Sequence, residues 1–365
     1  MKLKVYIAAT RQHDGKTVLS LGLMHALGQR VKSIGYIKPV GQQYLVIDNC
    51  MIDKDVVLMS RIYKLKDRLV DMSPIAVPRG FTEAYIMRPR KKALWGRVTK
   101  SFANVCRDKE MVLIEGTGHA GVGGVFDLSN AEVARLLGAK VILISLGGVG
   151  RPIDEILLNK AMFDQAGVEI LGVIINKVKE DKFDKINTLV RKSLNSRGME
   201  VLGVVPFDPI LSNPTVGEII REIDGKLLWG RHKLNEQAGR YVVGAMPLAT
   251  ALDYFKGKYF LITPGNREDL ILAALTQSLI GDQASSVLTG IVITGGILPH
   301  RNILELVKKT EFPLILVDDD TYSATSKIVS LNFKIKAEDT TKIKETQELI
   351  EKYVDVDRIF SLLKK

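Results

Sequence analysis

A glycine, a lysine and a threonine follow one another near the start of the chain, at a spacing that suits phosphate binding. They end the segment ATRQHDGKT, residues 9–17, which comes directly after an apolar run. Gly15 lets backbone amides curl towards an anion, Lys16 can reach terminal phosphates, and the Thr17 hydroxyl can coordinate magnesium. The general pattern has a glycine where this chain has Thr10. The segment predicts a phosphate-binding loop whose ligand contacts come from Asp14, Gly15, Lys16 and Thr17.

Three further polar residues follow apolar runs and are candidates for the same site. Glu115 opens the segment EGTGHAGVGG, and an acid at such a strand end can hold magnesium or orient water. Lys38 in GYIKPV can offer a second cation to a phosphate or carboxylate, and Asn176 can pair with a nucleotide base. Each also has a structural alternative: Glu115 as the cap of a surface turn, Lys38 as a surface lysine, and Asn176 as part of an exposed turn.

The elements that must position these residues alternate between strand and helix up to about residue 215. The strand candidates are rich in valine and isoleucine and mostly apolar throughout, which is typical of strands buried on both faces of a parallel sheet. They are Lys4 to Ala8, Val31 to Tyr36, Met111 to Ile114, Val141 to Ser145, Ile170 to Ile175 and Val201 to Val205. The pattern predicts a doubly wound, mostly parallel α/β domain whose ligands lie beyond the carboxyl ends of the strands.

A second, smaller α/β pattern follows. We expect a P-loop domain over residues 1–215, a charged connector over 216–239, a second domain over 240–345 and a helical tail over 346–365. The second domain has the turn motifs Asn266-Arg267 and Thr294-Gly295-Gly296, and it has no second Gly-Lys-Ser/Thr.

Composition restricts the class of protein. The 365 residues carry a net charge of +11, but the basic residues are dispersed and few aromatic residues lie among them, which argues against nucleic acid as a partner. Cys50 and Cys106 are far apart and predict neither a disulfide framework nor a zinc site, which suits a cytoplasmic protein. No apolar run approaches the length of a membrane span. The N-terminal apolar run is short and predicts a buried first strand rather than a signal peptide.

The first domain resembles the dethiobiotin synthetase family and its relatives, the cobyrinic acid diamide synthases and the N-terminal region of long phosphotransacetylases. The resemblance rests on six pieces in the same order, which together cover about the first 210 residues. They are ATRQHDGKT, GYIKPV, IDKDVVLM, VLIEGTGHAGVGG, GVIINKV and GVVPFDP.

The second domain resembles the DRTGG domain that follows the synthetase-like domain in long phosphotransacetylases. Asn266 stands where the name-giving motif has an aspartate. The acetyltransferase domain of those enzymes has no counterpart in the 365 residues, so we do not expect acetyl transfer by this chain alone.

The resemblance implies a role for several residues. Lys16 and Thr17 would hold ATP phosphates and magnesium, and Asp55 and Glu115 would complete the metal shell. Lys38 would face the reacting phosphate or carboxylate, which makes Lys16, Lys38 and Glu115 the candidate catalytic residues. The adenine pocket would be lined by Asn176 and Pro206.

Other positions depart from the family pattern or leave two roles open. His13 replaces an acidic residue of the synthetase loop, and Ala9 replaces its first glycine. Arg11 either reaches the phosphates of a partner subunit, as a lysine does in related dimeric ATPases, or contacts phosphate or solvent within its own chain. His119 either shuttles a proton or positions its turn. Residues that could contact substrate or a dimer partner are Arg11, His13, Gly116, Thr117 and His119.

Three functions agree with these observations. In the first, which we favour, the chain binds Mg-ATP, hydrolyses it slowly and acts as a sensor or regulator, as a homodimer and with a metabolic enzyme as partner. In the second it is a ligase in which ATP activates a small carboxylate or carbamate and an amine attacks the acyl phosphate; Lys16, Lys38 and magnesium would stabilise the transferring phosphate. In the third it is a partition-type ATPase, which only the net charge and Arg11 favour.

Overall fold

The computed structural model describes residues 2–280, 286–330 and 335–365. It divides into two compact units, each with its own core. Unit 1 comprises Met1–Leu211 and Ile335–Lys365, and unit 2 comprises Ser212–Lys334, so unit 2 is inserted in the sequence of unit 1. The grouping differs from the four predicted segments, because residues 346–365 belong to unit 1 and residues 216–239 belong to unit 2.

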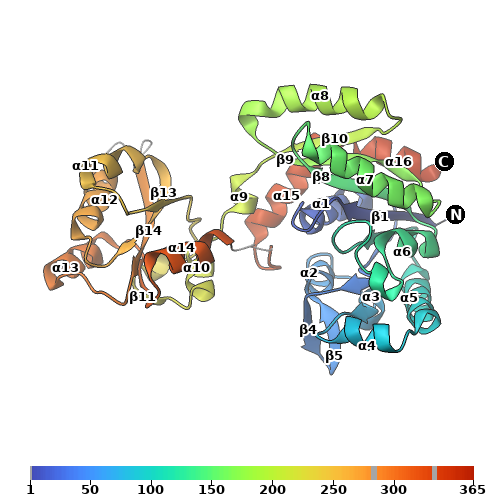
Figure 1. Cartoon of the computed structure of the whole chain (residues 1–365), viewed down its shortest axis with the longest axis horizontal. Helices are drawn as coiled ribbons and strands as arrows, with labels where there is room; N and C mark the ends of the chain where they lie inside the picture. Colours follow the sequence, from blue (N-terminus) through green and yellow to red (C-terminus); the bar gives the residue numbers. More distant parts are fainter. Residues whose placement is uncertain (1, 281–285, 331–334) are drawn as a thin grey trace. The chain divides into compact units, whose positions relative to one another are not determined.

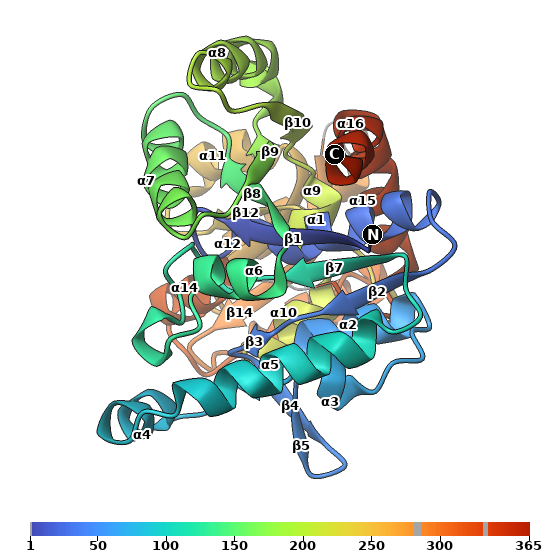
Figure 2. The same ribbon diagram turned by 90° about the vertical axis from the view of Figure 1, so that its right-hand side faces the viewer.

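Unit 1 is built on a six-stranded sheet in the order β10-β9-β8-β1-β7-β2, with parallel neighbours throughout (Figures 1 and 2). The strands are β1 (Leu3–Ala9), β2 (Ile34–Ile37), β7 (Met111–Glu115), β8 (Lys140–Leu146), β9 (Ile170–Val178) and β10 (Val201–Pro206). Side chains from both faces of the sheet are buried in one core. The predicted α/β fold with a parallel central sheet is confirmed.

Helices cover both faces of this sheet (Figure 2). Contacts place α5 (Lys91–Cys106) against β2 and β7, α7 (Arg151–Gln165) against β8, and α8 (Phe183–Asn195) against β10. Right-handed crossovers put these helices and α6 (Asn130–Leu137) on one face and α1 (Lys16–Gly28) on the other. Because α1 and α7 leave the neighbouring strands β1 and β8 towards opposite faces, the strand order reverses at these two strands, and ligands of such sheets bind beyond the carboxyl ends of the strands at this switch point.

The C-terminal helices complete unit 1 on the α1 face (Figure 1). They are α15 (Thr340–Tyr353) and α16 (Val356–Lys364), and both contact α1. Helix α15 approaches closely at Gly22, where a Cβ atom would lie 2.2 Å from Ile350 Cγ1. The segment between the two helices bridges the edge strand β10, since Val354 pairs with Gly203. The C-terminal segment is therefore an integral layer of unit 1.

Shorter elements connect β2 to β7. The hairpin of β4 (Tyr44–Ile47) and β5 (Cys50–Asp53) leads into α2 (Lys54–Ile62). The two-residue strands β3 (Val40–Gly41) and β6 (Ile75–Ala76) pair with each other. Two short helices, α3 (Leu69–Met72) and α4 (Phe81–Met87), precede α5. After β10, the short helix α9 (Pro209–Ser212) spans the point in the sequence where unit 1 passes into unit 2.

Unit 2 is a five-stranded sheet in the order β11-β15-β14-β13-β12, in which only β11 is antiparallel to its neighbour. The strands are β11 (Lys226–Trp229), β12 (Arg240–Val243), β13 (Gly257–Pro264), β14 (Ser286–Thr294) and β15 (Leu314–Leu316). The helices are α10 (Val216–Glu222), α11 (Leu248–Ala251), α12 (Glu268–Ile280), α13 (Arg301–Thr310) and α14 (Thr321–Ser330). The two sheet faces bury separate apolar clusters, one with α11, α12 and α13 and one with α10 and α14. The predicted second, smaller α/β domain is confirmed.

The two turn motifs of unit 2 lie at the ends of the neighbouring strands β13 and β14. Arg267 forms an ion pair with Asp269 at 2.9 Å and donates a hydrogen bond to Met246 O at 2.9 Å. Gly295 and Gly296 have φ values of 79° and 66° and donate their amides to the chain that follows β15. Within unit 2, these motifs therefore hold the loops at the carboxyl edge of its sheet.

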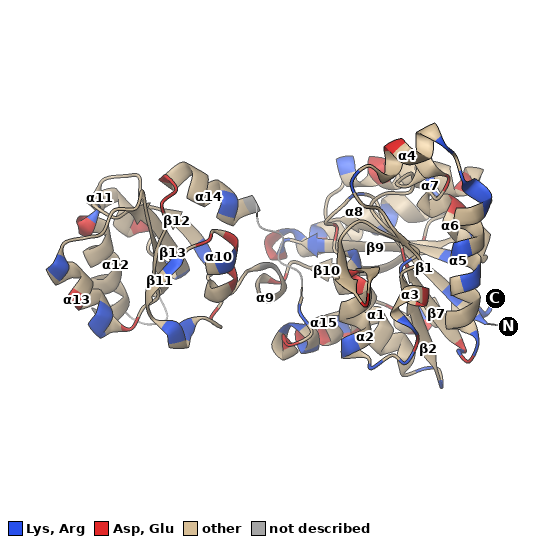
Figure 3. Cartoon of the chain, turned by 90° about the horizontal axis from the view of Figure 1, so that it is seen from below, with Lys and Arg blue, Asp and Glu red and all other residues tan. Residues whose placement is uncertain are grey.

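Charged side chains of both signs are distributed over each unit (Figure 3). None of the helices in the described part of the chain is long and apolar enough to cross a membrane. Both cysteines are free thiols.

Candidate functional site

The phosphate-binding loop joins β1 to α1, and Gly15 is the N-cap residue of the helix. The φ angle of Gly15 is 97°, in the left-handed region that favours glycine. A Cβ atom there would lie 2.2 Å from the side-chain nitrogen of Asn176. Asn176, near the end of β9, donates from this nitrogen to Asp14 O at 2.8 Å. Asn176 thus supports the loop backbone, and glycine is required where the two segments meet.

Two side chains of the loop fold back onto its own backbone. Asp14 Oδ2 accepts hydrogen bonds from Thr10 Oγ1 and from the Arg11 amide, both at 2.8 Å. Lys16 Nζ donates to Arg11 O at 3.2 Å, and burial lowers the pKa of its ammonium to about 8. The loop thereby holds a buried cation beside the amino end of α1, where the helix dipole also favours an anion.

Asp14 places a negative charge inside a loop that would bind phosphate. Burial raises the pKa of this carboxyl group above its ordinary value, and hydrogen bonds from Thr10 and Arg11 oppose the shift. The folded state therefore binds the proton more readily than the unfolded state, so the Asp14 contribution to stability becomes less favourable as the pH rises through the unfolded pKa of about 4.

We therefore expect Asp14→Asn to stabilise the protein at pH 7, since asparagine keeps a hydrogen-bond acceptor and removes the charge. The gain in thermal stability should shrink as the pH approaches about 4. Loss of the negative charge should also tighten ATP binding by roughly two- to tenfold. Thermal unfolding at several pH values and calorimetric titration with ATP measure the two effects, and a variant that is less stable at pH 7 would contradict the expectation.

The predicted metal ligands come together from three elements, Thr17 from α1, Asp55 from α2 and Glu115 from the carboxyl end of β7. Thr17 Oγ1 donates to Glu115 Oε1 at 3.0 Å, and Tyr36 OH donates to Glu115 Oε2 at 2.9 Å. Lys38 Nζ forms an ion pair with Asp55 Oδ2 and lies 3.8 Å from Glu115 Oε1. Thr17, Lys38, Asp55 and Glu115 thus lie in one cluster, in which Lys38, Asp55 and Glu115 are buried and Thr17 is half-buried.

Asp53 belongs to the same cluster, although it was not among the predicted site residues. Its Oδ1 lies 3.1 Å from Lys38 Nζ and also accepts the Asp55 amide at 2.9 Å, as the N-cap of α2. An aspartate just before an amphipathic helix is an N-cap signal, which could have drawn attention to it. Burial of Lys38 by itself would lower the pKa of its ammonium, but the carboxylates of Asp55, Glu115 and Asp53 raise it above its ordinary value.

The cluster has the chemistry of a magnesium site. Magnesium prefers hard oxygen ligands, and Thr17, Asp55 and Glu115 offer a hydroxyl and two carboxylates. Asp53 Oδ2 is buried without a hydrogen-bond partner in the described part of the molecule. Among the described residues, no three His, Cys, Asp or Glu side chains are placed to hold a metal by themselves. A metal here would therefore also need Thr17, phosphate or water as ligands.

Two buried asparagines hold the glycine-rich turn after β7, and neither was predicted. Asn130 accepts hydrogen bonds from Tyr6 OH at 2.8 Å and from the Thr117 amide at 3.0 Å, and donates to Thr117 O and His119 O. Asn159 accepts from the Ala120 amide at 2.8 Å and donates to Glu155 O. A Cβ atom on Gly116 would lie 2.5 Å from Asn130 Oδ1. The turn is therefore fixed by side chains of α6 and α7, which sequence spacing does not reveal.

The predicted contact residues of the two loops are placed as follows. Arg11 forms an ion pair with Glu155 of α7 in the same chain. His13 has a φ of 67° and its carbonyl accepts from Lys177 Nζ at 3.0 Å. His119 is exposed, and its Nδ1 accepts the Gly121 amide at 3.2 Å. Pro206 ends β10, which neighbours the β9 strand of Asn176.

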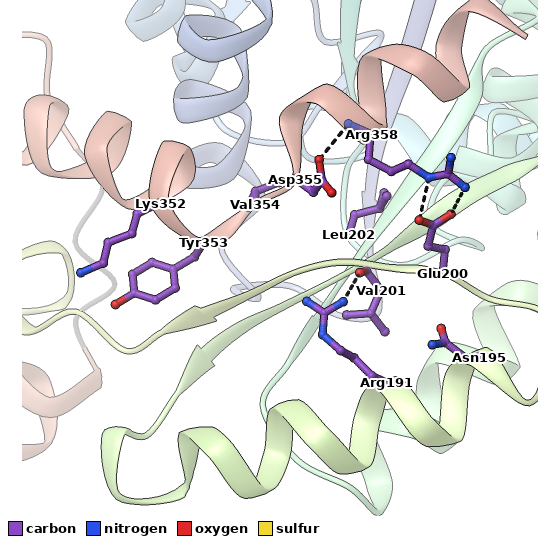
Figure 4. Close-up of a pocket in the computed structure, with 10 residues that line it drawn as sticks. All are labelled: Arg191, Asn195, Glu200, Val201, Leu202, Lys352, Tyr353, Val354, Asp355 and Arg358. Atoms are coloured by element: carbon purple, nitrogen blue, oxygen red, sulfur yellow. Dashed lines mark hydrogen bonds and ion pairs between the residues drawn. The ribbon is translucent and has the colours of Figure 1, made fainter.

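A polar pocket of about 410 Å³ lies elsewhere in unit 1, between α8, β10 and the C-terminal helices (Figure 4). Arg358 Nε and Nη2 donate to the Glu200 carboxylate at 2.7 and 2.9 Å, and Arg191 donates to Val201 O at 2.8 Å. Lys352, which also lines the pocket, lies over the Tyr353 ring. The Glu200–Arg358 pair joins the residue before β10 to α16 and so helps to anchor the C-terminal segment.

Comparison with known proteins gives matches to two domain families and to curated proteins. The AAA_26 profile, described as an AAA domain, matches residues 4–215, and the DRTGG domain matches residues 218–331. A phosphate acetyltransferase of Nitratidesulfovibrio vulgaris is 25% identical over 372 residues, covering 100% of this chain and 52% of that protein. A phosphate acetyltransferase of Synechocystis is 24% identical over 376 residues, which again cover 100% of this chain and 52% of that protein. The chain thus spans about half the length of the curated relatives it matches.

Among solved structures, the septum site-determining protein MinD of Pyrococcus horikoshii, complexed with Mg-ADP, matches with 16% identity and a TM-score of 0.35. It covers 58% of this chain and 84% of that one. The CBS and DRTGG domains of a Clostridium perfringens pyrophosphatase, complexed with diadenosine tetraphosphate, match with 14% identity and a TM-score of 0.28. This match covers 45% of the present chain and 82% of the pyrophosphatase chain.

Proposed function

Because the chain belongs to the AAA_26 family, with a P-loop domain followed by a DRTGG domain, we propose that unit 1 binds ATP together with magnesium. The observation that carries the proposal is the convergence of Lys16, Thr17 and Glu115 at the amino end of α1. Lys16 supplies a cation for the terminal phosphates, and Thr17 with Glu115 supplies oxygen ligands for the metal. Asn176 and Pro206, on neighbouring strands, would flank the adenine.

We further propose that the protein is a nucleotide sensor or regulator with slow ATPase activity. The presence of a DRTGG domain in the same chain supports a regulatory role. The two turn motifs of this domain lie at one edge of the unit 2 sheet. The two free thiols of the protein and the proposed use of ATP both suit the reducing cytoplasm. A metabolic enzyme is the kind of partner such a sensor would regulate.

One observation favours a ligase as the second candidate. Lys38 places a buried ammonium beside the proposed metal ligands, where it could stabilise charge on an acyl phosphate or carbamoyl phosphate. A sensor does not require this second cation for binding alone. The ligase would activate a small carboxylate or carbamate and transfer it to an amine.

Phosphate release from Mg-ATP by the purified chain tests the proposal, with Thr17→Ala as the control. We expect slow, steady release that falls by roughly 10- to 100-fold in the variant, because the hydroxyl ligand of the metal is lost. Thr17→Ser, which keeps the hydroxyl, should retain most of the wild-type rate. Release that accelerates severalfold with a carboxylate and an amine would favour the ligase, and release that Thr17→Ala leaves unchanged would contradict the site.

A further inference from the structure

Lys38 makes its ionic contacts with the carboxylates around the proposed metal site. Its Nζ pairs with Asp55 Oδ2 and lies 3.1 Å from Asp53 Oδ1 and 3.8 Å from Glu115 Oε1. All four side chains are buried, with 6% of Lys38 exposed and 1–2% of each acidic residue. The Lys38 ammonium is thus the cation that lies among these three carboxylates.

This cluster has more negative than positive charge. The three carboxylates and the Lys38 ammonium have a formal charge of −2, and the buried Lys16 ammonium, which interacts with Glu115 and Asp55, brings the total to −1. Burying charge without compensation is costly, so such a cluster favours the uptake of a further cation. Asp53 supports this view independently, because its Oδ2 is buried and has no hydrogen-bond partner within the described residues.

The oxygens that Lys38 contacts are also the ones that a metal would need. Asp55 and Glu115 are proposed metal ligands, and Glu115 Oε1, which lies 3.8 Å from Lys38 Nζ, also accepts the Thr17 hydroxyl. A divalent cation bound to these oxygens would lie within a few ångströms of the ammonium, and like charges at that distance repel strongly in a buried site. The Lys38 ammonium and the divalent cation therefore compete for the same carboxylates, and the binding of one weakens the ionic contacts of the other.

We propose that Lys38 is an exchangeable counter-ion of the metal site. It is the counter-ion of Asp53, Asp55 and Glu115 while no divalent cation is bound, and it gives up these carboxylates when the cation arrives. Its ammonium then becomes available to an anionic group of the bound ligand. The inference deepens the proposed function and rests on it, since the site is the same one.

The proposal predicts that Lys38 weakens metal binding, although it belongs to the site. We would measure Mn²⁺ binding to the full chain by electron paramagnetic resonance, without nucleotide. Lys38→Met removes the competing ammonium, and the double variant Lys38→Met/Asp53→Asn removes it at an unchanged formal charge of −2. Asparagine can also keep the N-cap hydrogen bond to the Asp55 amide, which Asp53 accepts at 2.9 Å. We expect both variants to bind Mn²⁺ about tenfold more tightly or better.

The controls separate this inference from the proposed function. Lys179→Met removes an exposed lysine and should leave Mn²⁺ affinity unchanged. If Lys38→Met fails to fold, the charge-matched double variant carries the test. If neither folds, acylation of Lys38 in the wild-type chain should rise severalfold on adding Mg²⁺, and an unchanged yield would overturn the proposal.

Binding of Mg-ATP to the wild-type chain is measured alongside. If ATP binds and the double variant takes up Mn²⁺ no more tightly than the wild type, the exchange is refuted and the proposed function stands. If the wild-type chain binds neither Mn²⁺ nor ATP, the proposed function itself fails.

Discussion

Replacing Lys16 with alanine is expected to weaken ATP binding by roughly 10- to 150-fold, the value of one hydrogen bond to a charged group. The Lys16 ammonium is held in the loop by Arg11 O at 3.2 Å, with 9% of the residue exposed. It therefore needs little reorganisation to meet a phosphate, and the backbone amides cannot replace its charge. Calorimetric titration with Mg-ATP measures the loss.

The matched control is Lys179→Ala, which removes an exposed lysine after β9. This variant should bind ATP like the wild type. Thermal unfolding should show that Lys16→Ala keeps its fold, because the loop retains the Asp14 and Asn176 hydrogen bonds. Unchanged ATP affinity in a folded Lys16→Ala protein would exclude the phosphate loop as the ATP-binding site.

Ending the chain at residue 215 is expected to abolish folding of unit 1, even though the predicted P-loop domain ends there. Truncation removes α15 and α16, which bury Leu349, Ile350, Ile359 and Leu363. Four such side chains contribute about 6–12 kcal/mol of burial, which is comparable to the whole stability of a typical domain, about 5–15 kcal/mol. The truncation also exposes the face of α1 around Gly22, which α15 covers in the full chain.

The matched variant keeps the C-terminal helices and removes unit 2. Residues 212–334 would be replaced by a Gly/Ser linker of about 15 residues, long enough to be flexible. We expect this protein to unfold cooperatively and to bind Mg-ATP, and the truncated one to lack a cooperative transition in circular dichroism. A truncated chain that folds and binds ATP would contradict the integral role of the C-terminal helices.

The parts that local patterns determine could be predicted from the sequence. The phosphate loop is a contiguous segment between a strand and a helix, so residues 9–17 indicated it directly. Glu115 and Lys38 became candidates for one site because the carboxyl ends of parallel strands share one edge of the sheet, and in the structure the two side chains lie close together. The parallel sheet itself followed from the apolar strands, although β2 starts at Ile34, three residues later than expected.

The remaining features depend on contacts between segments far apart in the chain. The sequence did not show that Lys38 lies on Asp53 and Asp55, because the hairpin between them sets that geometry. Asn130 and Asn159 bond mainly to backbone groups, which leave no compositional signal. The placement of α15 on α1 joins residues more than three hundred positions apart, so periodicity indicated a helix without its partner.

The central claim is that unit 1 binds ATP with the help of magnesium. Calorimetric titration of the full chain with a non-hydrolysable ATP analogue, with and without magnesium, tests it most directly. We expect one site per chain, with an affinity that magnesium raises at least about tenfold in the wild type and leaves nearly unchanged in Thr17→Ala. Absence of binding, or binding that ignores both magnesium and Thr17, would contradict the account.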